Sequence, residues 1–210
     1  MIVVTGCGRS GTGYAAALLS ALEIECGHER VFTPETQVAP RDLGGLTADA
    51  SWLAAPFLSD LPDGAVVLHQ VRDPVAVVAS LLGIRFFSHP RRAPISTRMT
   101  DGVELARRAI VRKRRRPIRR DFVRFIQRHE PVILEPHTEL ERTVTYWVRW
   151  NMMIERLVGS RPYLRYRVED MDARLVGRIL GLAGVSRSAD AIERVLASVP
   201  TSINSRRRST

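Results

Sequence analysis

Apolar residues along the chain occur in short runs, some β-branched and others rich in alanine and leucine. Short β-branched runs that end at glycine or polar residues are typical of buried strands, and runs rich in alanine and leucine favour helix. The pattern predicts strands over Ile2–Thr5, Ile24–Gly27, Ala65–Val71 and Tyr163–Val168. It predicts helices over Thr12–Leu22, Ser51–Leu61, Pro74–Gly83, Thr138–Gly159, Asp172–Ala183 and Ser188–Val199.

The order of these elements indicates the fold class. Strands that alternate with helices form a parallel sheet covered on both faces. We therefore predict an α/β fold of three layers, with a short central parallel sheet flanked by helices. Thr33–Thr47 is rich in proline, glycine and polar residues and is predicted as a loop, and Ile84–Ala106 has no clean period and is predicted as an irregular excursion. A chain of 210 residues is expected to form one domain, with an insertion over about 84–130.

Composition narrows the class of protein. With 45% apolar residues the chain is expected to be globular. The segment after Met1 has no basic region and only a short apolar run, so a signal peptide is not expected, and no run approaches the ~18 residues that cross a bilayer. We therefore expect a cytoplasmic protein without a transmembrane segment. Cys7 and Cys26 lie at predicted strand ends and suggest neither a disulfide framework nor a zinc site.

The net charge of +10 is concentrated in one segment. Arg107–Arg128 contains eleven Lys or Arg residues and one acidic residue, Asp121, whereas the rest of the chain balances. Three interpretations stay open: a solvated helical excursion, a surface that attracts an acidic acceptor or an anionic lipid, and a nucleic-acid site. Nucleic acid is disfavoured because the remaining domain is neutral and only Phe122 and Phe125 interleave aromatics with the basic run.

A glycine-rich loop joins the first predicted strand to the first predicted helix. Its glycines allow a tight turn that presents backbone N–H groups to an anion, and the helix N-terminus behind it adds partial positive charge. These features predict a phosphate site in a P-loop-type fold. The loop consists of Gly6, Cys7, Gly8, Arg9, Ser10, Gly11, Thr12, Gly13 and Tyr14.

The loop differs from that of nucleotide triphosphatases. Their pattern, G-x-x-x-x-G-K-[ST], is matched at Gly6 and Gly11, but Thr12 stands in place of the lysine and Gly13 in place of the hydroxyl that binds magnesium. The cation within the loop is Arg9. The sequence therefore predicts a phosphate cradle that is poorly equipped for Mg-ATP.

A second candidate phosphate site begins where the strand Ala65–Val71 ends. Arg72 follows that strand, Pro74 starts the next helix, and Ser80 comes about two turns later. Arginine offers a permanently charged, bidentate fork to phosphate. The alternative is that Arg72 forms a local ion pair with Asp73 and that Ser80 is a packed hydroxyl.

Together the two segments resemble the sulfotransferases that use 3′-phosphoadenosine 5′-phosphosulfate (PAPS) as the sulfuryl donor. Arg9-Ser10-Gly11-Thr12, followed by Tyr14, is similar to that family's 5′-phosphosulfate loop, although Gly13 replaces its usual hydroxyl residue. Arg72 and Ser80 have the spacing of the pair that binds the 3′-phosphate. Weaker similarities are Tyr146, Trp147 and Asn151 on the long helix, and the segment Leu164–Met171, in which Val168 replaces a tyrosine.

The resemblance implies where the donor binds and what the protein does. PAPS would bind to Gly8–Tyr14, Arg72 and Ser80, with Tyr14 stacking on adenine and a basic tail containing Arg206 closing over the 3′-phosphate. The sulfuryl group would pass to a hydroxyl or amine of a small-molecule, glycan or lipid acceptor, acidic ones included, without a metal. The sequence identifies neither that acceptor nor the oligomeric state.

The acceptor proton requires a base. Glu29 follows the second predicted strand and is our candidate, His28 is the reserve, and Arg9 would stabilise developing charge. The alternative is a solvated Glu–Arg pair at a strand end. His69, inside a strand, is expected to be a core histidine. Two other functions remain, a P-loop nucleotide kinase or NTPase and a polyanion-binding protein on a degenerate P-loop scaffold.

Overall fold

The computed structural model describes residues 1–88 and 120–200. Their five strands form one sheet in the order β2-β3-β1-β4-β5, and every neighbouring pair is parallel. The glycine loop joins the central strand to the first helix, the arrangement of a P-loop-type fold. The strands are β1 (Ile2–Thr5), β2 (Cys26–His28), β3 (Ala48–Ala50), β4 (Val66–Val71) and β5 (Tyr163–Arg167).

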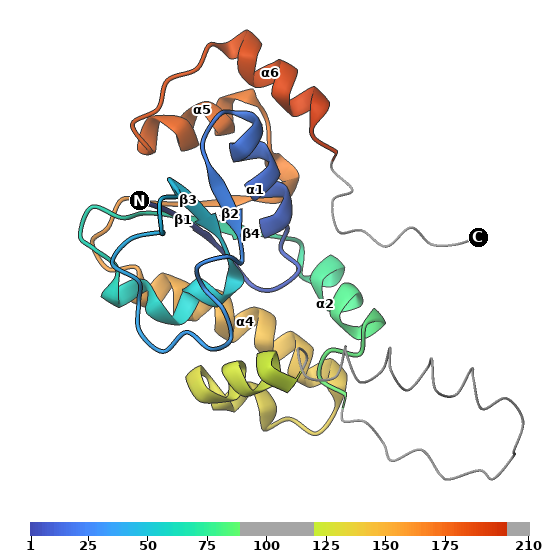
Figure 1. Ribbon diagram of the computed structural model, residues 1–210. Helices are drawn as coiled ribbons and strands as arrows, with labels where there is room; N and C mark the ends of the chain where they lie inside the picture. Colours follow the sequence, from blue (N-terminus) through green and yellow to red (C-terminus); the bar gives the residue numbers. More distant parts are fainter. Residues whose placement is uncertain (89–119, 201–210) are drawn as a thin grey trace, which may run out of the picture.

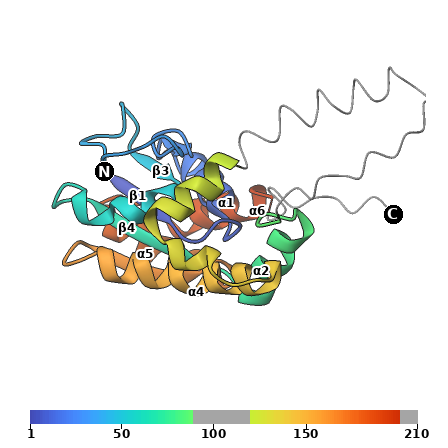
Figure 2. The same ribbon diagram turned by 90° about the horizontal axis from the view of Figure 1, so that it is seen from below.

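Helices cover both faces of the sheet (Figures 1 and 2). The α-helices are α1 (Thr12–Ala21), α2 (Pro74–Gly83), α4 (Glu139–Leu157), α5 (Ala173–Leu182) and α6 (Ala189–Ser198), and residues 120–129 are also helical. The 3₁₀ segments are η1 (Trp52–Asp60), η2 (Pro131–Leu134) and η3 (Val168–Asp170). Asp73 caps α2 by accepting the Ala76 N–H at 2.8 Å, and Thr138 forms a capping box with Glu141 at the start of α4.

Two hydrophobic cores hold the three layers together. In β1, Val3 belongs to the core shared with η1, α2, α4 and residues 120–129, whereas Val4 belongs to the core shared with α1, α5 and α6. Successive side chains of a strand point to opposite faces. Both faces of β1 are therefore buried, which explains its unbroken apolar sequence. The predicted three-layer α/β fold is confirmed.

Two sequence predictions need correction. The strand β3 was not predicted, because Ala-Asp-Ala has low strand propensity and follows a polar loop. β3 lies between β2 and β1, so the strand that precedes Glu29 is not the direct sheet neighbour of the strand that leads into the glycine loop. The helix predicted over Ser51–Leu61 is a 3₁₀ helix that contains Pro56, a residue without the N–H that an α-helix interior requires.

Several predictions fall on residues outside the described ranges. They are residues 89–106 of the irregular excursion, residues 107–119 of the basic segment, and the tail that contains Arg206. Within the ranges 1–88 and 120–200, no helix combines the length and apolarity needed to span a membrane.

Candidate active site

One cavity of about 1100 Å³ opens at the carboxyl ends of the parallel strands, where ligands bind in such sheets. Residues that follow β1, β2, β3, β4 and β5 all contribute to its wall. Every predicted site residue that the structure describes lines it. They are Gly8, Arg9, Ser10, Gly11, Thr12, Gly13, Tyr14, His28, Glu29, Arg72 and Ser80.

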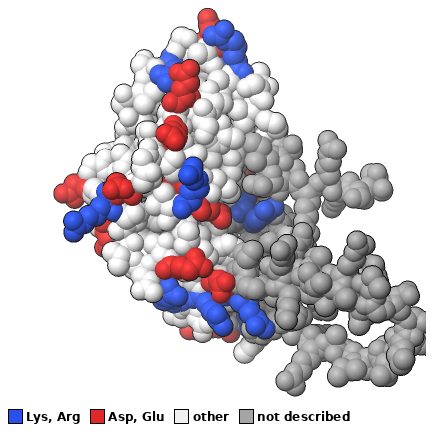
Figure 3. All heavy atoms as spheres, in the orientation of Figure 1, with Lys and Arg blue, Asp and Glu red and all other residues white. Residues whose placement is uncertain are grey.

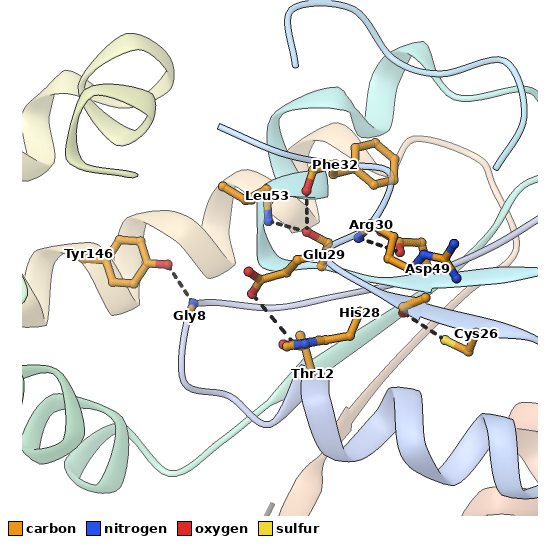
Figure 4. A network of polar contacts seen from close by, with 12 residues as sticks. Gly8, Thr12, Cys26, His28, Glu29, Arg30, Phe32, Asp49, Leu53 and Tyr146 are labelled. Carbon is orange, nitrogen blue, oxygen red and sulfur yellow. Dashed lines mark hydrogen bonds and ion pairs between the residues drawn. The ribbon is translucent and has the colours of Figure 1, made fainter. Parts of the chain in front are cut away.

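Three consecutive residues of the glycine loop are each bonded to a different part of the fold. The Tyr146 hydroxyl on α4 accepts the Gly8 N–H at 2.6 Å, as Figure 4 shows. Arg72, after β4, donates from Nη1 to the Arg9 carbonyl at 3.2 Å. Gln70, within β4, donates from Nε2 to the Ser10 carbonyl at 2.8 Å. The loop is therefore held in shape by its surroundings before any ligand arrives.

The backbone of the loop requires glycine at two positions. A Cβ on Gly6 would lie 2.1 Å from the Gln70 carbonyl oxygen, and Gly11 has a φ of 100°, a left-handed conformation. Arg9 also has a positive φ, 73°, although it is not glycine. Backbone strain of this kind costs ~1 kcal/mol or more and persists where surrounding contacts impose it.

The loop retains donors that fit an anion. No side chain caps α1, and the first N–H groups of a helix have no partner within it. Thr12 and Gly13, at the start of α1, line the cavity. The Ser10 hydroxyl is fully buried and has no hydrogen-bond partner among the described residues. A buried hydroxyl without a partner is costly, and an anion in the loop would satisfy it.

The two residues of the second predicted phosphate site are hydrogen-bonded to Arg9 of the glycine loop. Arg9 Nε donates to the Ser80 hydroxyl at 2.8 Å, and Arg72 bonds the backbone of the same Arg9. Two guanidinium groups and one hydroxyl therefore lie together where β1 and β4 end. The Asp73 carboxylate accepts the Ala76 N–H at the start of α2, and the Asp73 backbone N–H donates to Glu169 Oε1 at 2.8 Å. The Asp73 carboxylate thus serves the helix start, as an N-cap does.

The candidate base lies on the other side of the loop, at the end of β2. His28 Nε2 is 3.3 Å from the Thr12 hydroxyl and 3.8 Å from a Glu29 carboxylate oxygen, so the three side chains form a chain of contacts (Figure 4). Glu29 has a φ of 53°, again left-handed. Burial raises the pKa of the Glu29 carboxyl above its ordinary value, although the neighbouring His28 acts in the opposite direction. A carboxyl with a raised pKa is a stronger proton acceptor once it is ionised.

Sequence analysis did not assign the residues that hold the site together. Tyr146 and Trp147 appeared only as weak similarities, yet Tyr146 anchors Gly8 and Trp147 Nε1 donates to the Arg72 carbonyl at 3.2 Å. Gln70 was hidden in a strand, where Tyr166 donates to its side-chain carbonyl at 2.9 Å. In the sequence, the signal for Gln70 was its polar side chain within a mostly apolar strand.

Two further sequence predictions concern buried groups. His69 is a core histidine as expected, because its two ring nitrogens lie 2.8 Å from the Tyr163 hydroxyl and 2.8 Å from Asn151 Oδ1. Burial lowers the pKa of His69 to about 4, which keeps the ring neutral. Cys7 and Cys26 are both free thiols. Within the described ranges, no three His, Cys, Asp or Glu side chains gather as metal ligands would.

The described residues carry slightly more acidic than basic side chains, so the excess of +10 arises from residues outside those ranges. On the face shown in Figure 3, blue and red side chains of the described residues are interspersed. The described surface therefore offers no extended basic face there. The chemical character of a ligand of the cavity is therefore inferred from the residues that line it.

Comparison with known proteins finds similar solved structures. No protein-family model matches the chain, and no curated protein matches its sequence. Among solved structures, a sulfotransferase from Alicyclobacillus acidocaldarius is similar at 16% sequence identity with a TM-score of 0.44. The match covers 93% of this chain and 89% of that one.

Proposed function

We propose that this protein is a sulfotransferase that takes the sulfuryl group from PAPS and transfers it to a hydroxyl or amine. The observation that carries the proposal is the meeting of Arg9, Arg72 and Ser80 beside the glycine loop in one cavity. A nucleotide with phosphates at both the 3′ and 5′ positions needs two anion sites. The loop supplies one of them and the Arg72–Ser80 pair the other.

Each group has a distinct task in this proposal. PAPS supplies an activated sulfuryl group when it is bound. The N–H groups at the start of α1 and the Arg9 guanidinium would hold the 5′ side and stabilise charge that moves onto the leaving phosphate. Arg72 and Ser80 would bind the 3′-phosphate, and Glu29 would accept the acceptor's proton.

His28 is best understood as a neighbour that orients Glu29. It lies between the Thr12 hydroxyl and the Glu29 carboxylate. A second group that fixes the rotamer of a catalytic carboxylate preserves the geometry that proton transfer requires. If Glu29 does not serve as the base, His28 is the titratable side chain in contact with it that also lines the cavity.

Binding of adenosine 3′,5′-bisphosphate, compared with binding of ATP plus magnesium, tests the proposal. We expect the bisphosphate to bind in the micromolar range without magnesium. The missing loop lysine and magnesium-binding hydroxyl should make ATP-Mg a poor ligand. A preference for ATP-Mg would instead favour a kinase or NTPase. Binding of neither nucleotide, with retention of a polyanion such as heparin, would favour a polyanion-binding protein.

A further inference from the structure

The strand β3 carries a carboxylate in the interior of the protein. Asp49 is fully buried, as are Ala48 and Ala50 on either side of it. A buried carboxylate is costly unless hydrogen-bond donors surround it, and aspartate is depleted in strands. A residue that breaks both rules is expected where it serves a function, because some other gain must offset the cost.

The donors around Asp49 come from the turn that follows β2. The Arg30 N–H donates to Asp49 Oδ1 at 3.3 Å (Figure 4). Burial raises the pKa of the Asp49 carboxyl, whereas hydrogen bonding from the backbone of Arg30, Phe32 and Val31 lowers it. Successive backbone N–H groups of a turn form a concavity that binds an anion. The Asp49 carboxylate is the anion that this turn binds.

A glycine in β2 leaves room for the contact between Asp49 and the turn. Gly27 is paired with Asp49 in the register of β2 and β3. A Cβ on Gly27 would lie 2.5 Å from Asp49 Oδ1, closer than such atoms approach in proteins. The Asp49 side chain therefore occupies the space beside Gly27 on its way to the Arg30 backbone.

The two residues after Asp49 hold the same turn. The Ala50 carbonyl accepts the Glu29 N–H at 3.2 Å, and the Ser51 hydroxyl donates to the Phe32 carbonyl at 3.3 Å. Within this turn Glu29 has its left-handed φ of 53°. A residue other than glycine keeps such a conformation where surrounding contacts impose it. Three consecutive residues that begin with Asp49 supply those contacts.

The left-handed conformation determines where the Glu29 side chain lies. Successive residues of a continuing strand point to opposite faces, so His28 and Glu29 would point apart if β2 ran on. Instead both side chains line the cavity, and the Glu29 carboxylate lies 3.8 Å from His28 Nε2. Figure 4 shows this carboxylate directed toward His28 and Thr12, with Asp49 on the other side of the turn.

From these contacts we infer that Asp49 is a positioning residue for Glu29. Its carboxylate holds the turn that brings Glu29 to the same side as His28, where the acceptor's proton would be taken up. The inference rests on the proposed function for the role of Glu29, whereas the placement of Glu29 is a property of the folded protein alone. Asp49 acts through Glu29 and does not exchange the proton itself.

Titration of the Glu29 carboxyl tests this placement without requiring turnover. Carbon-13 NMR of protein labelled at the glutamate carboxyls follows the titration, and Glu29→Gln assigns the signal. In the wild type, burial is the main cause that raises the pKa of Glu29 above its ordinary value. His28 lowers this pKa, and Asp49 contributes a smaller increase.

Two substitutions of Asp49 separate its position from its charge. Asp49→Ala removes the acceptor of the Arg30 N–H, so the turn should relax and the pKa of Glu29 should fall to its ordinary value in water. Asp49→Asn keeps an acceptor and loses the charge, so the pKa of Glu29 should lie between those of the wild type and Asp49→Ala. Equal values in the two variants would mean that Asp49 acts by charge alone. A wild-type value in Asp49→Ala would mean that Asp49 does not place Glu29, and either result overturns the inference.

Gly27→Ala is a second variant, which keeps both carboxylates and also serves if Asp49→Ala does not fold. Its Cβ should displace the Asp49 side chain from the turn, so the pKa of Glu29 should fall although the Asp49 charge remains. Tyr163→Phe is the control, because it loses a hydrogen bond to His69 and should leave the Glu29 titration unchanged. An unchanged titration in Gly27→Ala, or an equal fall in Tyr163→Phe, would contradict the inference.

Transfer and donor binding distinguish this inference from the proposed function. With a hydroxyl compound that the wild type sulfates, Asp49→Ala should slow single-turnover transfer roughly 10- to 100-fold, because a misplaced base loses its geometry. Asp49→Asn should recover most of the rate, and bisphosphate affinity should be unchanged in both variants. If bisphosphate binds and Asp49→Ala transfers normally, the positioning role is wrong and the donor site stands. If bisphosphate does not bind at all, the sulfotransferase function fails, and the titration of Glu29 still decides whether Asp49 places it.

Discussion

The Tyr146 hydroxyl accepts the N–H of Gly8 at 2.6 Å, although 138 positions separate the two residues in sequence. Tyr146 is fully buried on α4, and Gly8 lies in the glycine loop. A Cβ on Gly8 would come within 3.0 Å of the Tyr146 oxygen, so the glycine permits this close approach. The contact ties the helix layer directly to the loop that is proposed to bind the donor.

Replacement of Tyr146 by phenylalanine should affect both stability and donor binding. It leaves the buried Gly8 N–H without its partner, which should lower the free energy of unfolding by about 1–3 kcal/mol. Bisphosphate affinity should fall as well, because the loop loses one of its three anchors. Urea unfolding and isothermal titration measure the two effects.

Tyr163→Phe is the matched control for this change. It removes a phenolic hydrogen bond to His69 Nδ1, outside the cavity. It should reduce stability while leaving bisphosphate affinity unchanged. Equal affinity loss in both variants would show that Tyr146 acts through general stability and that its bond to the loop has no special role.

Arg72→Ala should weaken binding of adenosine 3′,5′-bisphosphate while the fold is retained. A charge-assisted phosphate contact contributes about 1.5–3 kcal/mol, or roughly a 10- to 150-fold change in affinity. Arg165→Ala is the control, since Arg165, in β5, pairs with Glu155 of α4 and is half-exposed. Wild-type affinity in Arg72→Ala would remove the 3′-phosphate assignment and with it much of the case against a kinase.

Glu29→Gln should slow sulfuryl transfer about 10²- to 10⁴-fold, the usual contribution of a general base, while bisphosphate affinity is kept. The wild-type rate should rise with pH as Glu29 ionises, over a range displaced upward because burial raises the pKa of this carboxyl. In the variant this rise should disappear. Single-turnover transfer from radiolabelled PAPS, with a hydroxyl compound that the wild type sulfates as acceptor, followed across pH, measures both effects.

Other results of the Glu29 experiment assign different roles. Unchanged transfer by Glu29→Gln would move the base to His28, and His28→Gln would then show the loss. A variant that no longer binds bisphosphate would instead make Glu29 a structural support of the loop, acting through His28, which contacts both Glu29 and Thr12.

Asp49→Asn should change how stability depends on pH. Burial is the main cause that raises the pKa of Asp49 in β3, and its Oδ2 has no hydrogen-bond partner among the described residues. The folded state therefore keeps its proton to a higher pH than the unfolded state. As pH rises through that interval, the wild type loses stability that the uncharged variant retains.

Urea unfolding of both proteins between about pH 3 and pH 7 measures the effect of Asp49. The unfolding free energy of Asp49→Asn, relative to wild type, should increase with pH. The Asn side chain retains an acceptor for the Arg30 N–H that Asp49 Oδ1 accepts at 3.3 Å. A difference that is constant with pH would mean that the Asp49 carboxyl titrates alike in the folded and unfolded chains.

Much of the fold could be predicted from the sequence, because the signals that define several of its helices and strands lie within a few neighbouring residues. The helix Pro74–Gly83 was predicted with the bounds it has, since Asp73 and Pro74 form a start signal that acts within one turn. The apolar runs of β1 and β4 likewise require burial on both faces wherever they lie.

The strand β3 could not be predicted in this way. Ala-Asp-Ala becomes a strand because β1 and β2 pair with it from either side, through residues far away in sequence. Its own side chains give no such signal, and Asp49 argues against one.

By itself, the sequence determined the chemical parts of the candidate site: a glycine loop, an arginine and a serine eight residues apart, and a carboxylate after a strand. These depend on residue type and on short spacings that one turn or one helix imposes. Only the tertiary structure decided that Arg9 meets Ser80 and Arg72, that Tyr146 holds Gly8, and that aromatic rings line the same cavity as Glu29. The physical reason is that the order of strands in the sheet and the packing of α4 against it set these distances, and both arise from contacts between residues remote in sequence.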